Sequence, residues 1–233
     1  MAFNNYGNRF QQTTPIVLNL IIINVLVYLA QMVTSGSVEP NQAGDLFGLH
    51  HYKSIYFQPY QVVTHMFMHG GFFHLLFNMF ALWMFGTAVE RVWGPKKFLI
   101  FYFICGLGAA FTQMGSYAFD WWQVDHSGAL SEELNEMYQT RLRLSYTVGA
   151  SGAIMGILAA FGYLFPNTEM LIIPIPVPIK AKWAIMGMIA LDVFGGVVKV
   201  QGDNVAHFAH IGGAAIGFLL VLYWNKTNKK TFY

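Results

Sequence analysis

Residues 148–165 read VGASGAIMGILAAFGYLF and residues 205–224 read VAHFAHIGGAAIGFLLVLYW, and neither stretch contains aspartate, glutamate, lysine or arginine. Each is close to the length of about 20 residues that a helix needs to cross the hydrocarbon core of a bilayer. Similar apolar stretches recur along the chain. The sequence therefore predicts six membrane-spanning helices, over approximately 15–33, 72–89, 98–114, 148–165, 183–198 and 205–224.

The composition of the 233 residues agrees with a lipid environment, since 55% are apolar, 10% are charged and the mean hydropathy is +0.45. Soluble proteins carry about 25% charged residues. We predict an all-α, polytopic membrane protein with a single domain over residues 1–233. The one cysteine, Cys105, permits no intramolecular disulfide and is expected to pack in the core. The net charge of +2 is too small to indicate nucleic-acid binding.

The distribution of lysine and arginine predicts the orientation of the chain. If the amino terminus is inside, nine of the 13 basic residues lie on the inner side, as the positive-inside rule requires. Both termini are then cytoplasmic, and the second, fourth and sixth spans run from outside to inside. The connection over 34–71 is expected to rest in the membrane interface. A surface helix is expected after Ser131, and an extended connector at the prolines of 174–178.

Polar side chains within spans are costly, so each is a candidate for function. The second span opens with His74 and Asn78, the fourth with Ser151 and the sixth with His210. Because these spans run in one direction, their first turns lie at one depth, within roughly 10 Å of the outer helix ends. The four side chains are therefore predicted to converge on a shallow pocket.

Glycines explain how the fourth and sixth spans could approach each other. Gly152 and Gly156 in one span, and Gly213 and Gly217 in the other, would let the two backbones pack together. A hydrogen bond between a serine hydroxyl and an imidazole requires such closeness.

The converging residues predict nucleophilic catalysis. A serine hydroxyl becomes a nucleophile when a general base within about 2.6–3.2 Å takes its proton, and His210 is the candidate base for Ser151. The oxyanion of a tetrahedral intermediate would be stabilised by His74, Asn78 and the backbone N–H of Ser151 at its helix amino terminus.

Each of these features also has a structural interpretation. In a membrane helix, Gly-x-Ser-Gly is by itself most often a packing motif, and no strand is expected before Tyr146, unlike the elbow of soluble hydrolases. Asp192 in the fifth span is not expected to be oriented toward His210. A structural hydrogen bond to a neighbouring helix is the preferred interpretation of that aspartate.

Metal binding is a further alternative for the histidines. His65, His69 and His207 could bind a metal ion together with His210, but no His-Glu-x-x-His pattern or carboxylate partner accompanies them. We therefore expect no metal and no cofactor.

Taken together, these residues resemble the rhomboid intramembrane serine proteases of the basic six-helix bacterial type. The resemblance rests on four elements in the expected order: HLLFN at 74–78, GTAVERVWG at 86–94, GASG at 149–152, and AHIGG at 209–213 followed by Gly217. It covers nearly the whole chain.

The resemblance implies a dyad of Ser151 and His210 without an aspartate, with His74, Asn78 and the Ser151 backbone N–H as oxyanion donors. It implies that the substrates are single-span membrane proteins, cleaved near their outer membrane boundary where small or helix-breaking residues let the segment unwind. The expected location is the bacterial inner membrane.

The resemblance also assigns structural roles. It implies that 34–71 is the family's membrane-embedded lateral loop, and that Glu90 and Arg91 are structural polar residues near the inner face. Residues expected to shape the site are Gly149, Gly152, Met155, Gly213 and Gly217.

Two departures from the family pattern bear on these roles. Tyr60 and Gln61 occupy positions where the family often has tryptophan and arginine, which affects how the lateral loop is anchored. Met155 occupies a position where an aromatic residue often packs on the catalytic imidazole, so the support of that ring is expected to be softer.

Two other functions stay open at this point. A catalytically silent rhomboid-like protein could bind membrane clients, although such a binder has no need of all four polar residues. A small channel or transporter would use the histidines as pathway residues, but the sequence has no convincing internal repeat.

Overall fold

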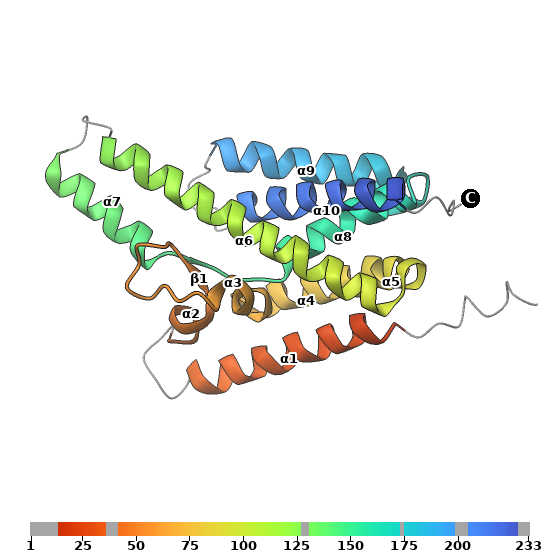
Figure 1. The fold of residues 1–233 in the computed structure, drawn as a ribbon, viewed down its shortest axis with the longest axis horizontal. Coiled ribbons are helices and arrows are strands. Elements are labelled where there is room, and N and C mark those ends of the chain that lie inside the picture. The colour runs from red at the N-terminus through yellow and green to blue at the C-terminus, as the bar shows by residue number, and fades with distance from the viewer. Residues whose placement is uncertain (1–13, 36–41, 127–130, 173–174, 199–204, 228–233) are drawn as a thin grey trace, which may run out of the picture.

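The structure is a computed structural model, and it describes residues 14–35, 42–126, 131–172, 175–198 and 205–227 (Figure 1). The elements in chain order are α1 (Pro15–Ser35), α2 (Gln42–Phe47), β1 (Leu49–His50), α3 (Gln61–Thr64), η1 (His65–Phe67), α4 (Phe72–Ala81), η2 (Leu82–Gly86), α5 (Thr87–Trp93), α6 (Pro95–His126), α7 (Glu132–Leu144), β2 (Tyr146–Thr147), α8 (Ser151–Leu164), β3 (Glu169–Ile172), β4 (Ile175–Lys180), α9 (Ala181–Val198) and α10 (His207–Thr227). The fold is an all-α, polytopic membrane fold.

All six predicted spans are helical. Five helical segments in the described residues are long and apolar enough to cross a membrane: α1, the continuous run α4–η2–α5, α6, α9 and α10. The sixth, α8, has 14 residues and a length of about 21 Å, which is shorter than the hydrocarbon core. Helix α6 continues to His126, so the first part of the predicted connection after residue 114 is helical instead.

Helix α8 forms the centre of the bundle, where it packs against α6 and α10. The glycines of α8 and α10 lie against each other. A Cβ atom at Gly213 would collide with the carbonyl oxygen of Gly152, and one at Gly217 would lie 2.6 Å from the Cα atom of Gly156. The two backbones therefore pack at a distance that only glycine permits.

Helices α4, α8 and α10 begin toward one end of the bundle and run toward the other, whereas α9 runs in the opposite direction (Figure 1). The start of α1 and the end of α10 both lie toward the second end. There, the two carboxylate oxygens of the buried Glu90 accept hydrogen bonds from the backbone N–H groups of Ile16 (3.0 Å) and Val17 (2.9 Å). A negative charge at a helix amino terminus is stabilising, so Glu90 fastens α1 to α5.

The loop between α1 and α4 is anchored by Gln61, whose side chain is fully buried. Its Nε2 donates to the carbonyl oxygens of Leu46 (3.2 Å) and Tyr56 (2.8 Å), and its Oε1 accepts from the backbone N–H groups of His50 (3.4 Å) and Gln58 (3.2 Å). A neutral amide can do this because it donates and accepts at once. The departure from the family pattern at this position thus leaves the loop firmly held.

Two other sequence expectations concern the connections. Ser131 does cap a surface helix, α7, because its Oγ accepts from the backbone N–H of Leu134 (3.4 Å). The proline-rich connector is extended, but in the form of the antiparallel hairpin of β3 and β4, with Glu169 opposite Lys180. Residues 173 and 174 lie outside the described residues.

Candidate active site

The hydroxyl of Ser151 and the imidazole of His210 meet between α8 and α10. The Ser151 Oγ and the His210 Nε2 are 2.8 Å apart, although the residues are 59 positions apart in the sequence. Ser151 is the first residue of α8, and His210 lies in the first turn of α10. This distance lies within the range that proton transfer from a serine to a general base requires.

The side chain of Asp192 is oriented toward His210, contrary to the expectation from the sequence. Its Oδ1 lies 3.0 Å from the Nδ1 of His210 and 2.8 Å from the Nδ1 of His207. The carboxylate, with a side chain 13% exposed, therefore joins α9 to two successive turns of α10. A hydrogen bond between Asp192 and a neighbouring helix was expected. One of the two imidazoles that it contacts is that of His210, the candidate general base.

The carboxylate also defines the tautomer of His210. Because a carboxylate oxygen accepts hydrogen bonds, the Nδ1 of His210 carries the proton. The Nε2 is then the acceptor for the Ser151 hydroxyl. The chain Asp192, His210 and Ser151 thus has the order of acceptor, relay and nucleophile that activates a serine.

The turn before Ser151 has a geometry that requires glycine. Gly149 has a φ of +131°, and its N–H donates to the carbonyl oxygen of His65 (2.9 Å). A Cβ atom at Gly149 would lie 2.8 Å from the His74 Nε2 and 3.4 Å from the Ser151 Oγ. A side chain at this position would therefore occupy the space beside the nucleophile and strain the backbone.

A short strand precedes this turn, in contrast to the sequence analysis. Tyr146 and Thr147 form β2, which pairs in antiparallel fashion with Leu49 and His50 of β1. The Thr147 hydroxyl also lies 2.6 Å from the hydroxyl of the Tyr117 phenol on α6. The nucleophile therefore follows a strand and a tight turn, and the strand pairs with β1 in the segment between α1 and α4.

His74 and Asn78 lie on one face of α4, as their spacing predicted. The ring of His74 adjoins Gly149, and its Nδ1 accepts from the backbone N–H of Gly70 (3.4 Å). The Nδ2 of Asn78 is buried and has no hydrogen-bond partner within the described part of the chain. A buried amide donor without a partner is costly, and this Nδ2 is available to donate to an acceptor placed beside it.

The remaining predicted residues are less informative. Met155 is buried in the core one turn after Ser151, and its support of the imidazole stays a prediction. The described residues hold no group of three histidine, cysteine, aspartate or glutamate side chains arranged to bind a metal ion.

His65 and His69, which the metal hypothesis included, are buried in the loop that precedes α4. The Nδ1 of His65 lies 2.8 Å from the carbonyl oxygen of Gln61. Burial lowers the pKa of both imidazoles from 6.5 to about 4. Both are therefore neutral near pH 7.

The sequence is similar to those of known proteins. A family model described as Rhomboid domain matches residues 56–226. Rhomboid protease AarA of Providencia stuartii is 30% identical over 213 residues, which cover 88% of this chain and 70% of that protein.

Two mitochondrial relatives match over shorter regions. Rhomboid protein 1, mitochondrial, of Saccharomyces cerevisiae is 30% identical over 173 residues, or 72% of this chain and 43% of the relative. Presenilin-associated rhomboid-like protein A, mitochondrial, of Danio rerio is 29% identical over 163 residues, or 70% of this chain and 37% of the relative. The match thus spans less than half of either mitochondrial protein.

Proposed function

The chain belongs to the rhomboid family, and from this premise we propose that it is an intramembrane serine endopeptidase. Its substrates are single-span membrane proteins, which it cleaves near their extracytoplasmic boundary. We place it in the bacterial inner membrane with both termini in the cytoplasm. The distribution of basic residues supports this orientation.

The proposed reaction begins when the Nε2 of His210 takes the proton of the Ser151 hydroxyl as its oxygen attacks the scissile carbonyl carbon. The resulting imidazolium is stabilised by Asp192 at Nδ1. His210 then gives the proton to the leaving amine, which departs as the amino-terminal end of the second fragment. A water molecule then attacks the carbonyl carbon of the acyl-enzyme while His210 takes its proton. His210 gives that proton to the Ser151 oxygen as the acyl bond breaks.

The oxyanion is stabilised by three donors. They are the backbone N–H of Ser151 at the amino terminus of α8, the imidazole of His74 and the amide of Asn78. The first N–H groups of a helix have no intrahelical partner, so the one at Ser151 is available. The unpartnered Nδ2 of Asn78 supports its assignment as a donor.

One observation carries the proposal, namely the 2.8 Å contact between Ser151 and His210 with Asp192 on the far nitrogen of the same ring. A catalytically silent rhomboid-like binding protein is the alternative. Binding of a membrane segment requires apolar surface and does not require a nucleophile, a base and a carboxylate in series. The arrangement therefore favours catalysis.

The test is cleavage of a panel of single-span substrates by the detergent-solubilised protein and by its Ser151→Ala variant. We expect the variant to be inactive at unchanged thermal stability, because the change removes one hydroxyl and little volume. Ser145→Ala is the matched control, because Ser145 lies six residues earlier and its hydroxyl donates only to the Arg141 carbonyl oxygen (2.8 Å).

Two further measurements separate the alternatives. A fluorophosphonate reagent should label Ser151 alone, and a chelator should leave cleavage unchanged. Substrate binding without cleavage by the parent protein would favour the silent binder. Inhibition by a chelator, reversed by zinc, would instead favour a metal site.

A further inference from the structure

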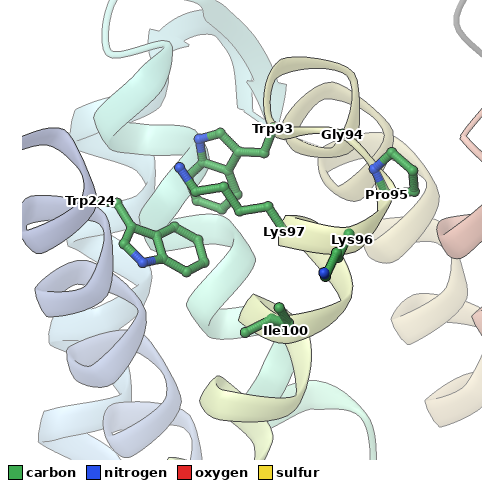
Figure 2. A pocket seen from close by; sticks show the side chains of 7 residues that line it. All are labelled: Trp93, Gly94, Pro95, Lys96, Lys97, Ile100 and Trp224. Carbon is green, nitrogen blue, oxygen red and sulfur yellow. The ribbon is translucent and has the colours of Figure 1, made fainter. Parts of the chain in front are cut away.

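A hollow lies at the end of the bundle opposite Ser151. It has a volume of about 470 Å³ and lies where the end of α5, the start of α6 and the end of α10 meet (Figure 2). Trp224 follows His210 on α10 by fourteen residues, a separation of about 21 Å along the helix. The hollow is therefore at the other membrane boundary and is independent of the candidate active site.

Two tryptophans and two lysines give the hollow its chemistry. The indoles of Trp93 and Trp224 meet edge to face with centroids 5.3 Å apart. The Lys97 ammonium lies 4.4 Å from the Trp224 ring centroid and 5.4 Å from that of Trp93 (Figure 2). Lys96, the second lysine of the lining, is exposed.

Within the described ranges, no protein carboxylate balances the positive charge of the hollow. Among the residues that the structure describes, no carboxylate oxygen lies within 4.0 Å of the Lys96 or Lys97 nitrogen. Glu90 lies close by on α5, but both of its carboxylate oxygens accept hydrogen bonds from the amino terminus of α1. Lys97 is partly buried, which lowers the hydration of its ammonium, so an anionic ligand beside it would gain both a charge partner and a hydrogen-bond donor.

An apolar track leads from the hollow along α6. Ile100 forms part of the lining, and Ile104 and Phe111 follow it at helical spacing on the same face. These three side chains are 45%, 37% and 64% exposed, so they face the lipid phase. A ligand with a phosphate beside hydrocarbon chains would match the lysines and the track together, whereas an acidic peptide would use the lysines alone.

We propose that this hollow binds the headgroup of an anionic phospholipid, with the phosphate at Lys96 and Lys97, the glycerol against the tryptophans and an acyl chain along α6. Tryptophan rings favour the interfacial region where the lipid backbone lies, and basic pockets between spanning helices bind anionic headgroups. The inference does not depend on proteolysis.

Native mass spectrometry of the protein in detergent micelles tests the proposal, with phosphatidylglycerol and phosphatidylcholine as probes. The parent protein should retain one phosphatidylglycerol more tightly than phosphatidylcholine. Each basic residue near an anionic lipid contributes roughly fivefold to affinity, so Lys96→Gln combined with Lys97→Gln should weaken retention about 25-fold.

The chain offers a matched control in Lys53. Its ammonium lies 4.4 Å from the Trp121 ring centroid, the same distance as Lys97 from Trp224, but it is far from the hollow. Lys53→Gln should leave retention of phosphatidylglycerol within twofold of the parent. If a thermal assay shows that the double variant is unfolded, Lys96→Gln alone replaces it, because that side chain is exposed and its loss should not disturb folding. A roughly fivefold loss of retention is then expected, since one basic residue is removed.

Three results would overturn the proposal. Equal retention of phosphatidylglycerol by the parent and the lysine variant would show that these lysines do not bind the headgroup. Displacement of the lipid by millimolar inorganic phosphate would indicate a site for free phosphate. Preferential binding of a hexaglutamate peptide would indicate an acidic protein partner instead.

Discussion

Asp192→Asn is the substitution that discriminates best between a positioning role and a purely structural role for this aspartate. The amide that replaces the carboxylate has nearly the same shape, so the packing of α9 against α10 should persist. The negative charge at 3.0 Å from the His210 Nδ1 is lost, and the amide can present a donor instead of an acceptor to that nitrogen. The imidazole would then lose both its preferred tautomer and the partner that stabilises its charged form.

The expected magnitude follows from the type of bond. A hydrogen bond to a charged group contributes about 1.5–3 kcal/mol. If the full amount is realised in the transition state, turnover falls about 10- to 150-fold. Activity should not vanish, because the Ser151 hydroxyl and the oxyanion donors are unchanged. The loss should appear in kcat with KM nearly constant, because Asp192 contacts the base and not the substrate.

The assay is the initial rate of cleavage of a single-span reporter per folded enzyme, with thermal unfolding in the same detergent as the measure of folding. Asp125→Asn is the matched control, because Asp125 lies 3.9 Å from the imidazole of His126 but the pair is exposed and remote from Ser151. Its kcat should equal that of the parent. A parental kcat for Asp192→Asn at equal stability would refute the positioning role, and a rise in KM alone would assign the aspartate to substrate binding.

Four other predictions follow from the site and its support. Asn78→Ala should lower turnover about 10²- to 10³-fold, the usual loss for one oxyanion donor; a parental rate in the same cleavage assay would exclude this role. Met155→Ala should lower turnover by loosening the imidazole, whereas Met155→Phe should preserve or raise it; equal rates at equal stability would show that Met155 does not support the ring. Glu90→Gln should lower the free energy of unfolding by about 1–3 kcal/mol with little effect on kcat per folded enzyme, measured by thermal unfolding in detergent. Since the pKa of His65 is lowered from 6.5 to about 4, the folded protein binds fewer protons than the unfolded chain between these values. The free energy of unfolding should therefore decrease as the pH is lowered from 7 toward 4, by roughly 2 to 3 kcal/mol in total, and His65→Gln should reduce this dependence.

The spanning helices could be predicted from the sequence because hydropathy and length follow directly from the thickness of the bilayer. The meeting of Ser151 and His210 could also be predicted, because the common direction of α8 and α10 sets their depth and the glycines set their separation. The spans and the depth of the polar residues follow from distances along a helix axis, whereas the approach of α8 to α10 follows from the glycine spacing, which marks the facing side of each helix.

The features that sequence reasoning missed depend on longer-range geometry. The strand β2 is two residues long, and it exists because Leu49 and His50 lie beside it, almost one hundred residues earlier in the chain. The anchoring by Gln61 likewise depends on carbonyl groups that only the folded loop brings together. No local pattern at either position encodes its partner.

Asp192 is a different case, because a signal was present in the sequence. His207 and His210 are three residues apart on α10 and therefore share a helix face. Gly195 follows Asp192 by the same interval on α9, and a Cβ atom there would lie 2.5 Å from the Nε2 of His207. The small residue thus gives one imidazole room beside α9, and the aspartate one turn earlier reaches both rings. Matching intervals on two antiparallel spans at similar depth define which faces meet, and they determine the rotation that hydropathy alone leaves undefined.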